Sequence, residues 1–219
     1  IGPNAAGKTS LLEAIHILAT TKSPRTNSDS ELVRWGAGIC RIEGGFVSHA
    51  GHPLRLAVGL DAAASGGALG RRLEVEGEAV SGPRDFIGRA SVVMFTPDDL
   101  AIIKGGPGLR RRFLNTALAQ LQPRYLDDLS RYKRALRQRN ELLKTLGHGA
   151  RPPTEARAWT EQLVRSGAAV AVTRRRFIGA LDAQAREVHR RIAGKEQLAL
   201  SYVGELADCA EEDTAAEVF

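Results

Sequence analysis

Hydrophobic residues recur with two different periods along the chain, and the change of period divides it into regions. In residues 11–20 they lie three and four positions apart, which predicts a helix with one buried face. In residues 38–80 they alternate with polar residues, which predicts an antiparallel meander of strands with one face in water. From about residue 119 the helical spacing returns and predicts two long helices, packed antiparallel as an arm. The pattern therefore indicates an α/β head followed by a helical arm.

Turn and capping residues divide these regions into individual elements. A glycine-rich turn at residues 65–67 separates two of the strands, and Thr96 with Pro97 is typical of a helix start. The apolar run over residues 90–95 suits a buried strand, and residues 196–203 alternate like a strand again. The other expected strands are residues 40–47, 54–60 and 72–75, and the other expected helices are residues 28–35, 84–88, 125–143 and 154–192.

The first ten residues carry a phosphate-binding motif. Gly2 to Thr9 fit the pattern G-x-x-x-x-G-K-[ST], the phosphate-binding loop of nucleoside triphosphatases. Small residues let backbone N–H groups surround a phosphate, Lys8 supplies a point charge, and the Thr9 hydroxyl suits Mg²⁺. The helical pattern that follows places the phosphates at a helix N-terminus. The predicted nucleotide-binding residues are Gly2, Pro3, Asn4, Ala5, Ala6, Gly7, Lys8, Thr9 and Ser10, with Thr9 as the metal ligand.

The same eight-residue pattern can also arise by chance in a surface loop. The complete match, and the helical pattern directly after it, favour nucleotide binding. A buried strand normally leads into a loop of this kind, and here only Ile1 precedes it. We therefore expect the sequence to begin inside a β–α unit.

Charge is distributed unevenly along the chain, whose net charge is +6. Residues 104–195 hold 21 basic and 7 acidic residues, a net charge of +14, whereas the segments before and after carry −1 and −7. This basic segment favours a polyanionic partner, and a solvated helix surface rich in arginine is the alternative. Aromatic residues make up only 5% of the chain, so binding of single strands by base stacking is less favoured than binding of a duplex or junction.

Composition excludes several classes of protein. The hydrophobic content of 43% and charged content of 26% are ordinary for a soluble globular protein. Cys40 and Cys209 have no metal-binding spacing and are typical of a reducing compartment. The chain has no apolar run of about 18 residues, so we expect no contact with a membrane and a cytoplasmic location.

Three stretches, taken in order, resemble one known family. They are the phosphate loop with the Leu11-Leu12-Glu13-Ala14-Ile15 run after it, the loop Thr21-Lys22-Ser23-Pro24-Arg25-Thr26, and the Phe95-to-Asn140 segment. The last contains Phe95-Thr96-Pro97-Asp98-Asp99-Leu100, then Arg110-Arg111 with Phe113-Leu114, then Gln138-Arg139-Asn140. With these motifs the chain resembles the RecF family, bacterial DNA-gap repair ATPases related to SMC and ABC-type heads.

The resemblance implies an ABC/SMC-type P-loop head over residues 1–118 and a helical arm over residues 119–219, with the C-terminal part of the head absent. It implies ATP and Mg²⁺ as cofactors, bound between two protomers of a homodimer that closes on DNA. It also implies action at single-strand gaps with RecO and RecR, helping RecA to load, and a link to the SOS response. The basic residues expected to contact DNA are Arg110, Arg111, Arg112, Arg131, Lys133, Arg134 and Arg137.

The chain also departs from the family pattern. It has no Leu-Ser-x-Gly-Gln-type signature and no Walker B strand, and the stretch after residue 95 has no glutamine for Mg²⁺. We therefore assign no catalytic residue, and we expect weak ATPase activity in the full dimer and none in this chain alone. The alternatives are another P-loop ATPase, SMC-like or a transporter subunit, and a small-molecule kinase. The basic segment fits the last two poorly.

Overall fold

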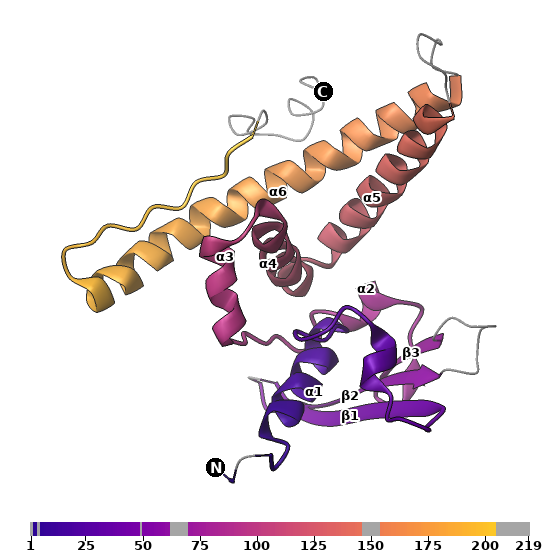
Figure 1. Cartoon of the computed structure of the whole chain (residues 1–219), viewed down its shortest axis with the longest axis vertical. Helices are drawn as coiled ribbons and strands as arrows, with labels where there is room; N and C mark the ends of the chain where they lie inside the picture. Colours follow the sequence, from indigo (N-terminus) through magenta and orange to yellow (C-terminus); the bar gives the residue numbers. More distant parts are fainter. Residues whose placement is uncertain (1, 4, 49, 62–69, 146–153, 205–219) are drawn as a thin grey trace. The chain divides into compact units, whose positions relative to one another are not determined.

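The computed structural model describes residues 2–3, 5–48, 50–61, 70–145 and 154–204. These residues form two compact units, Ile1–Pro123 and Arg124–Phe219, each of which is described by itself (Figure 1). The first unit includes the whole of helix α4 (Pro107–Leu121).

The first unit combines helices with one antiparallel sheet. The strands β1 to β4 are neighbours in chain order, so the predicted meander is confirmed. The expected helix over residues 11–20 is also confirmed, since α1 ends at Thr20. The elements are α1 (Lys8–Thr20), η1 (Asp29–Leu32), β1 (Ile39–Val47), β2 (Pro53–Asp61), β3 (Gly70–Val75), β4 (Glu78–Ala79), α2 (Pro83–Phe86), η2 (Pro97–Leu100), α3 (Ala101–Lys104) and α4 (Pro107–Leu121).

Helix α1 covers one face of the sheet (Figure 1). The buried side chains Leu56, Val58 and Leu60 alternate along β2 and form the centre of this face. Gly44 of β1 lies so close to α1 that a Cβ atom there would be 2.7 Å from Leu18 Cδ1. The helix therefore packs directly on β1, and the phosphate loop precedes a helix that is held against the sheet.

The opposite face of the sheet is closed by charged side chains. Arg41 on β1 donates to Glu74 Oε2 on β3 at 2.7 Å, and Arg72 Nε lies 2.7 Å from Glu74 Oε1. Ala57 and Gly59 of the intervening strand β2 are small, so the Arg41 side chain crosses above them. Ala57 is consequently buried although its position in the strand faces outward.

The segment after α2 is attached to the end of α4. Gly88 has a φ of +90°, and a Cβ atom there would lie 2.9 Å from the carbonyl oxygen of Gln120. The Gln120 side chain accepts a hydrogen bond from the Val92 amide at 2.8 Å. The predicted strand over residues 90–95 is wrong: the segment forms no ladder with any described strand, and Val93 and Phe95 are exposed. Its apolar residues were a poor guide because a strand also needs a neighbour for its backbone groups.

The second unit contains the two predicted long helices, α5 (Pro123–Lys144) and α6 (Thr154–Ala193). Arg174 Nε of α6 donates to the Tyr125 hydroxyl of α5 at 3.0 Å, and Arg139 Nε of α5 donates to Thr160 Oγ1 of α6 at 2.9 Å. The first contact joins the start of α5 to the second half of α6, and the second contact joins the end of α5 to the start of α6. The helices are therefore antiparallel neighbours, as predicted (Figure 1).

An extended segment follows α6 and lies along it. The Leu200 amide donates to Asp182 Oδ1 at 2.6 Å, and Tyr202 packs against Ala168, Ala171 and Val172. The predicted strand over residues 196–203 is wrong, because side chains of α6 rather than a neighbouring strand hold this segment. The turn expected at Pro152 and the acidic end of the chain lie outside the described residues.

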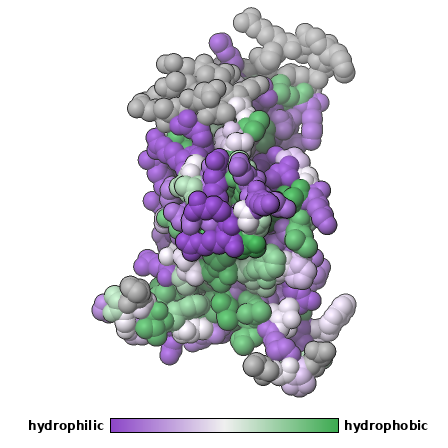
Figure 2. Space-filling model, turned by 90° about the vertical axis from the view of Figure 1, so that its left-hand side faces the viewer, coloured by the Kyte–Doolittle hydropathy of each residue, from purple (hydrophilic) through white to green (hydrophobic). Residues whose placement is uncertain are grey.

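The surface carries apolar as well as polar side chains, and both are interspersed on the face shown in Figure 2. The exposed apolar side chains include Trp35, Ile39, Val93 and Ile192. None of the helices in the described part of the chain combines the length and the apolar character that crossing a membrane requires.

Candidate functional site

The phosphate-loop residues lie directly before helix α1. Gly7 takes a φ of +79° and its carbonyl accepts the Leu11 amide at 2.9 Å, which is the first hydrogen bond of the helix. Ala5 also has a positive φ, of 66°, a conformation that glycine adopts at lower cost. The first turn of α1 contains no acidic residue. The N–H groups and the positive end of the helix dipole therefore face solvent without a competing carboxylate.

Lys8 folds back over the loop. Its Nζ donates to the Gly2 carbonyl at 2.6 Å and to the Pro3 carbonyl at 2.5 Å. An ammonium group has three N–H donors, so these contacts keep the charge beside the loop and leave one donor for an anion. The exposed residues Gly2, Pro3, Ala5, Ala6 and Gly7 lie in the loop, and the exposed residues Lys8, Thr9 and Ser10 begin helix α1, whereas Asn4 lies outside the described residues.

The predicted metal ligand, Thr9, offers one hydroxyl. Thr9 is exposed in the first turn of α1, next to Lys8. In the described part of the chain no three His, Cys, Asp or Glu side chains gather to hold a metal ion. A single exposed hydroxyl suits Mg²⁺, because Mg²⁺ keeps several waters and takes few protein ligands together with substrate phosphates. Cys40 carries a free thiol whose pKa is raised by burial, and Cys209 lies outside the described residues.

The three consecutive arginines of α4 differ in their contacts. Arg110 Nη1 donates to the carbonyls of Ile102 and Gly105 at 3.2 and 3.0 Å, so it fixes the end of α3. Arg112 Nη2 donates to the Ser23 carbonyl at 3.3 Å. Arg111 is exposed and makes no hydrogen bond or ion pair with the described residues. Arg111 is therefore the member of the cluster most available to an external anion.

The residues of α5 that are predicted to contact DNA, Arg131, Lys133, Arg134 and Arg137, are exposed. Arg131 pairs with Asp128 at 3.3 Å, whereas Arg134 and Arg137 make no such contact within the part of the chain that the structure describes. Lys133 is exposed and interacts with another residue. The α4 residues belong to the first unit and the α5 residues to the second, so each set is described within its own unit.

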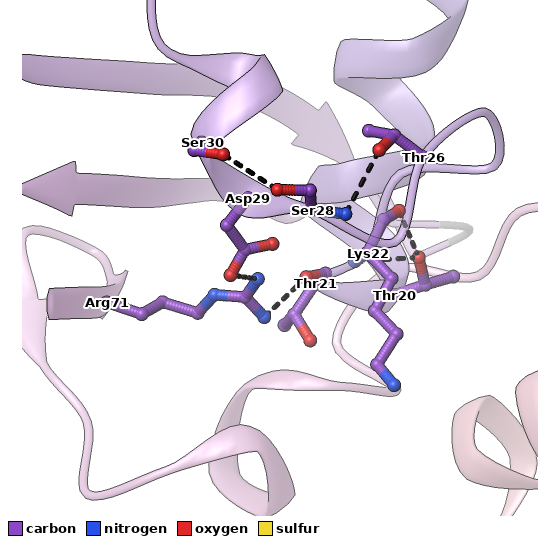
Figure 3. A network of polar contacts seen from close by, with 8 residues as sticks. All are labelled: Thr20, Thr21, Lys22, Thr26, Ser28, Asp29, Ser30 and Arg71. Atoms are coloured by element: carbon purple, nitrogen blue, oxygen red, sulfur yellow. Dashed lines mark hydrogen bonds and ion pairs between the residues drawn. The ribbon is translucent and has the colours of Figure 1, made fainter. Parts of the chain in front are cut away.

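Sequence reasoning missed Arg71, which is shown in Figure 3. The register of β3 places Arg71 opposite Leu60, on the helix-covered face where Leu73 and Val75 also lie. There Nη1 donates to the Thr21 carbonyl at 2.6 Å, and Nη2 forms an ion pair with Asp29 (Figure 3). The strand alternation contained the signal, since an arginine in a core-facing position requires a partner.

No protein-family model matches the chain. Curated sequences match most of it: the DNA replication and repair protein RecF of Halalkalibacterium halodurans is 42% identical over 203 residues, 92% of this chain. The Bacillus subtilis protein of the same description is 38% identical over 205 residues. This sequence belongs to the RecF family. The chain spans about half the length of these relatives, 53% of each.

Solved RecF structures agree with this assignment. One, described as the recombination mediator protein RecF-ATPrS in the RecFOR pathway, is similar with a TM-score of 0.88 and 27% identity, covering 99% of this chain and 57% of that one. Another, described as RecF-ATP in the same pathway, gives a TM-score of 0.83 and 25% identity over 98% and 57%. The predicted ABC/SMC-type α/β head with an antiparallel meander and a helical region is confirmed.

Proposed function

We propose that the protein containing this chain binds ATP with Mg²⁺ at the phosphate loop and acts on DNA in recombinational repair and replication. The observation that carries the proposal is the loop itself, with Gly7 opening α1 and Lys8 folded across it. Membership of the RecF family supports it, because solved relatives are described as RecF-ATP and as recombination mediators.

Lys8 and Thr9 have distinct roles in this proposal. Lys8 donates a charge-assisted hydrogen bond to the outer phosphates, and Thr9 holds Mg²⁺ through its hydroxyl. Mg²⁺, when bound, neutralises phosphate charge. Backbone N–H groups at the start of α1 donate hydrogen bonds to the remaining phosphate oxygens. Arg25, whose side chain is 58% exposed in the loop after α1, adds a second cation for phosphate.

DNA binding is assigned to the basic residues of α4 and α5. Lysine and arginine contacts to phosphates give affinity without reading sequence, and they suit a protein that recognises a duplex or a gap junction. The same proposal includes a homodimer that ATP closes on DNA, weak hydrolysis in that dimer, and action in the cytoplasm with RecO and RecR to help RecA load. It also includes the link to the SOS response.

Nucleotide binding is tested by titrating ATP into the intact protein and its Lys8→Ala variant. We expect the Kd for ATP to rise at least about tenfold, because a hydrogen bond to a charged group is lost. Lys104→Ala, which removes an exposed lysine at the end of α3, is the charge-matched control and should leave the Kd unchanged. An unchanged Kd in Lys8→Ala would remove the basis of the proposal.

DNA binding is tested by the salt dependence of affinity. Each phosphate contact contributes about 0.9 to the slope of log Kobs against log salt, so Arg111→Ala and Arg134→Ala should each reduce the slope by about 1. Arg55→Ala, on the sheet, is the control outside the predicted DNA set. A slope near zero for the unmodified protein, or equal slopes for all variants, contradicts the assignment of these residues.

A further inference from the structure

The loop after α1, residues 21–29, is held at both ends by one arginine of the sheet. Arg71 donates to the Thr21 carbonyl at the start of the loop and pairs with Asp29 at its end (Figure 3). The two contacts span 50 and 42 residues of sequence. The planar guanidinium presents its N–H groups in a fixed fork, so one side chain determines the separation of the two loop ends.

The first residue of this loop is strained. Thr21 has a φ of +61° and is buried, although a β-branched residue rarely adopts a positive φ. Its amide donates to the Ile17 carbonyl at 2.8 Å, which ends α1, and its carbonyl is the group that Arg71 binds. Strain of this kind persists only where surrounding contacts determine the conformation, and it gathers at functional sites.

The middle of the loop is fixed to α1 through Glu13. Ser23 is buried and its Oγ donates to Glu13 Oε1 at 2.5 Å, while the same Oγ accepts the amides of Arg25 and Thr26 at 3.0 and 3.1 Å. Arg25 Nη1 donates to Glu13 Oε2 at 3.3 Å. Arg112 of α4 adds its bond to the Ser23 carbonyl. The loop therefore has one conformation set from three sides, by the sheet, by α1 and by α4.

Arg25 is linked through Glu13 to the helix that carries Thr9 of the phosphate loop. Thr9 and Glu13 are four positions apart in α1, so their side chains lie on the same helix face, about 5–6 Å apart between Cβ atoms. Arg25 contacts Glu13 and still exposes 58% of its side chain. Arg25 thus contacts a residue that lies one helical turn from Thr9, and its guanidinium has five N–H donors, one of which is bound to Glu13.

We propose that Arg71 and Glu13 are positioning residues that fix the loop after α1 so that Arg25 reaches the phosphates of a nucleoside triphosphate bound at the phosphate loop. The proposal rests on the proposed function of that loop. Arg71 does not touch the ligand. It acts through Thr21 and Asp29, which limit where Arg25 can lie.

The test is a double-mutant cycle on ATP affinity, measured by titration of ATP into the intact protein. Arg25→Ala should raise the Kd about tenfold, and Arg71→Met should raise it several-fold. Since Arg71 acts through Arg25, the double variant should have the Kd of Arg25→Ala alone. Arg72→Met, the adjacent arginine on the opposite face of β3, is the matched control and should leave the Kd unchanged.

Several results would overturn the inference. Additive effects in the double variant would show that Arg71 supports the fold and not Arg25 specifically. If Arg71→Met lowers the folded fraction, Asp29→Asn replaces it in the cycle, because Asp29 is a partly exposed residue at the other end of the same contact. An effect of Arg25→Ala on DNA affinity alone, measured without nucleotide, would assign Arg25 to DNA phosphate and refute the inference. Lys8→Ala separates failure of this inference from failure of the proposed function. If Lys8→Ala leaves the Kd for ATP unchanged, the phosphate loop does not bind ATP and the proposed function itself fails.

Discussion

Gly88 offers a direct test of how the segment after α2 is attached to α4. In Gly88→Ala the added Cβ lies 2.9 Å from the carbonyl oxygen of Gln120, a distance at which one of the two must move. The carbonyl belongs to the last turn of α4 and cannot retreat without disturbing that turn. The residue also has a φ of +90°, which glycine adopts freely and alanine does not.

The expected cost has two parts. Placing a Cβ on a residue with positive φ costs about 1–2 kcal/mol, and forcing an extra methyl into a packed contact costs about 1–3 kcal/mol. Gly88→Ala should therefore lower the free energy of unfolding by about 2–5 kcal/mol. Gly36→Ala is the matched control, because Gly36 has a φ of +80° but no atom within 4 Å of the position its Cβ would take. It should lose only the first part, about 1–2 kcal/mol.

Urea unfolding followed by far-UV circular dichroism gives both values, fitted to the transition of the first unit because two units need not unfold together. Hydrogen exchange adds a local reading: the Val92 amide, which donates to the Gln120 side chain, should exchange faster in Gly88→Ala and unchanged in Gly36→Ala. Equal losses of stability in the two variants would refute the close approach of Gly88 to α4.

Two further predictions concern carboxylates. The hydrogen-bonded ion pair with Arg41 holds the pKa of Glu74 below its ordinary value of 4.5. The ion pair therefore stabilises the fold above that pH, and this stabilisation is lost as the pH falls through the lowered pKa. Glu74→Gln should reduce the fall in stability at acid pH, and an unchanged fall would contradict the pairing. Asp182→Ala removes the acceptor of the Leu200 amide, so hydrogen exchange of that amide should accelerate at least about tenfold. Glu187 pairs with Arg190 and Arg191 of the same helix, so the control variant Glu187→Ala should leave the exchange rate unchanged.

The sequence predicted those elements whose evidence is local. The period of the apolar residues places α1, α5 and α6 correctly, and strand alternation places β1 and β2, because one buried face is enough to define each of them. The signal for the phosphate loop is also local, since its chemistry requires fixed residue types at fixed spacing, and the nucleotide-binding role of these residues stays a prediction. The predicted strands over residues 90–95 and 196–203 failed because strand formation depends on a neighbour that local composition does not reveal.

Long-range polar contacts were beyond the sequence. Nothing local to Ser23 indicates that Glu13, Arg112 and two backbone amides meet around it. The sequence does not distinguish the consecutive arginines 110–112. In the structure Arg110 bonds the end of α3, Arg112 bonds the loop after α1, and Arg111 is exposed to an external anion. Such differences depend on where neighbouring elements lie, so they come only from the three-dimensional structure.

The ion pair that crosses β2 also restricts how this sheet can evolve. Ala57 and Gly59 touch no proposed ligand, yet Arg41 can reach Glu74 only while both remain small. A valine at either position would suit a strand by propensity but would block the bridge. Sequences that lose the glutamate are thus free to enlarge positions 57 and 59, whereas those that keep it are not. Small residues at these two positions should therefore be inherited together with the charged pair.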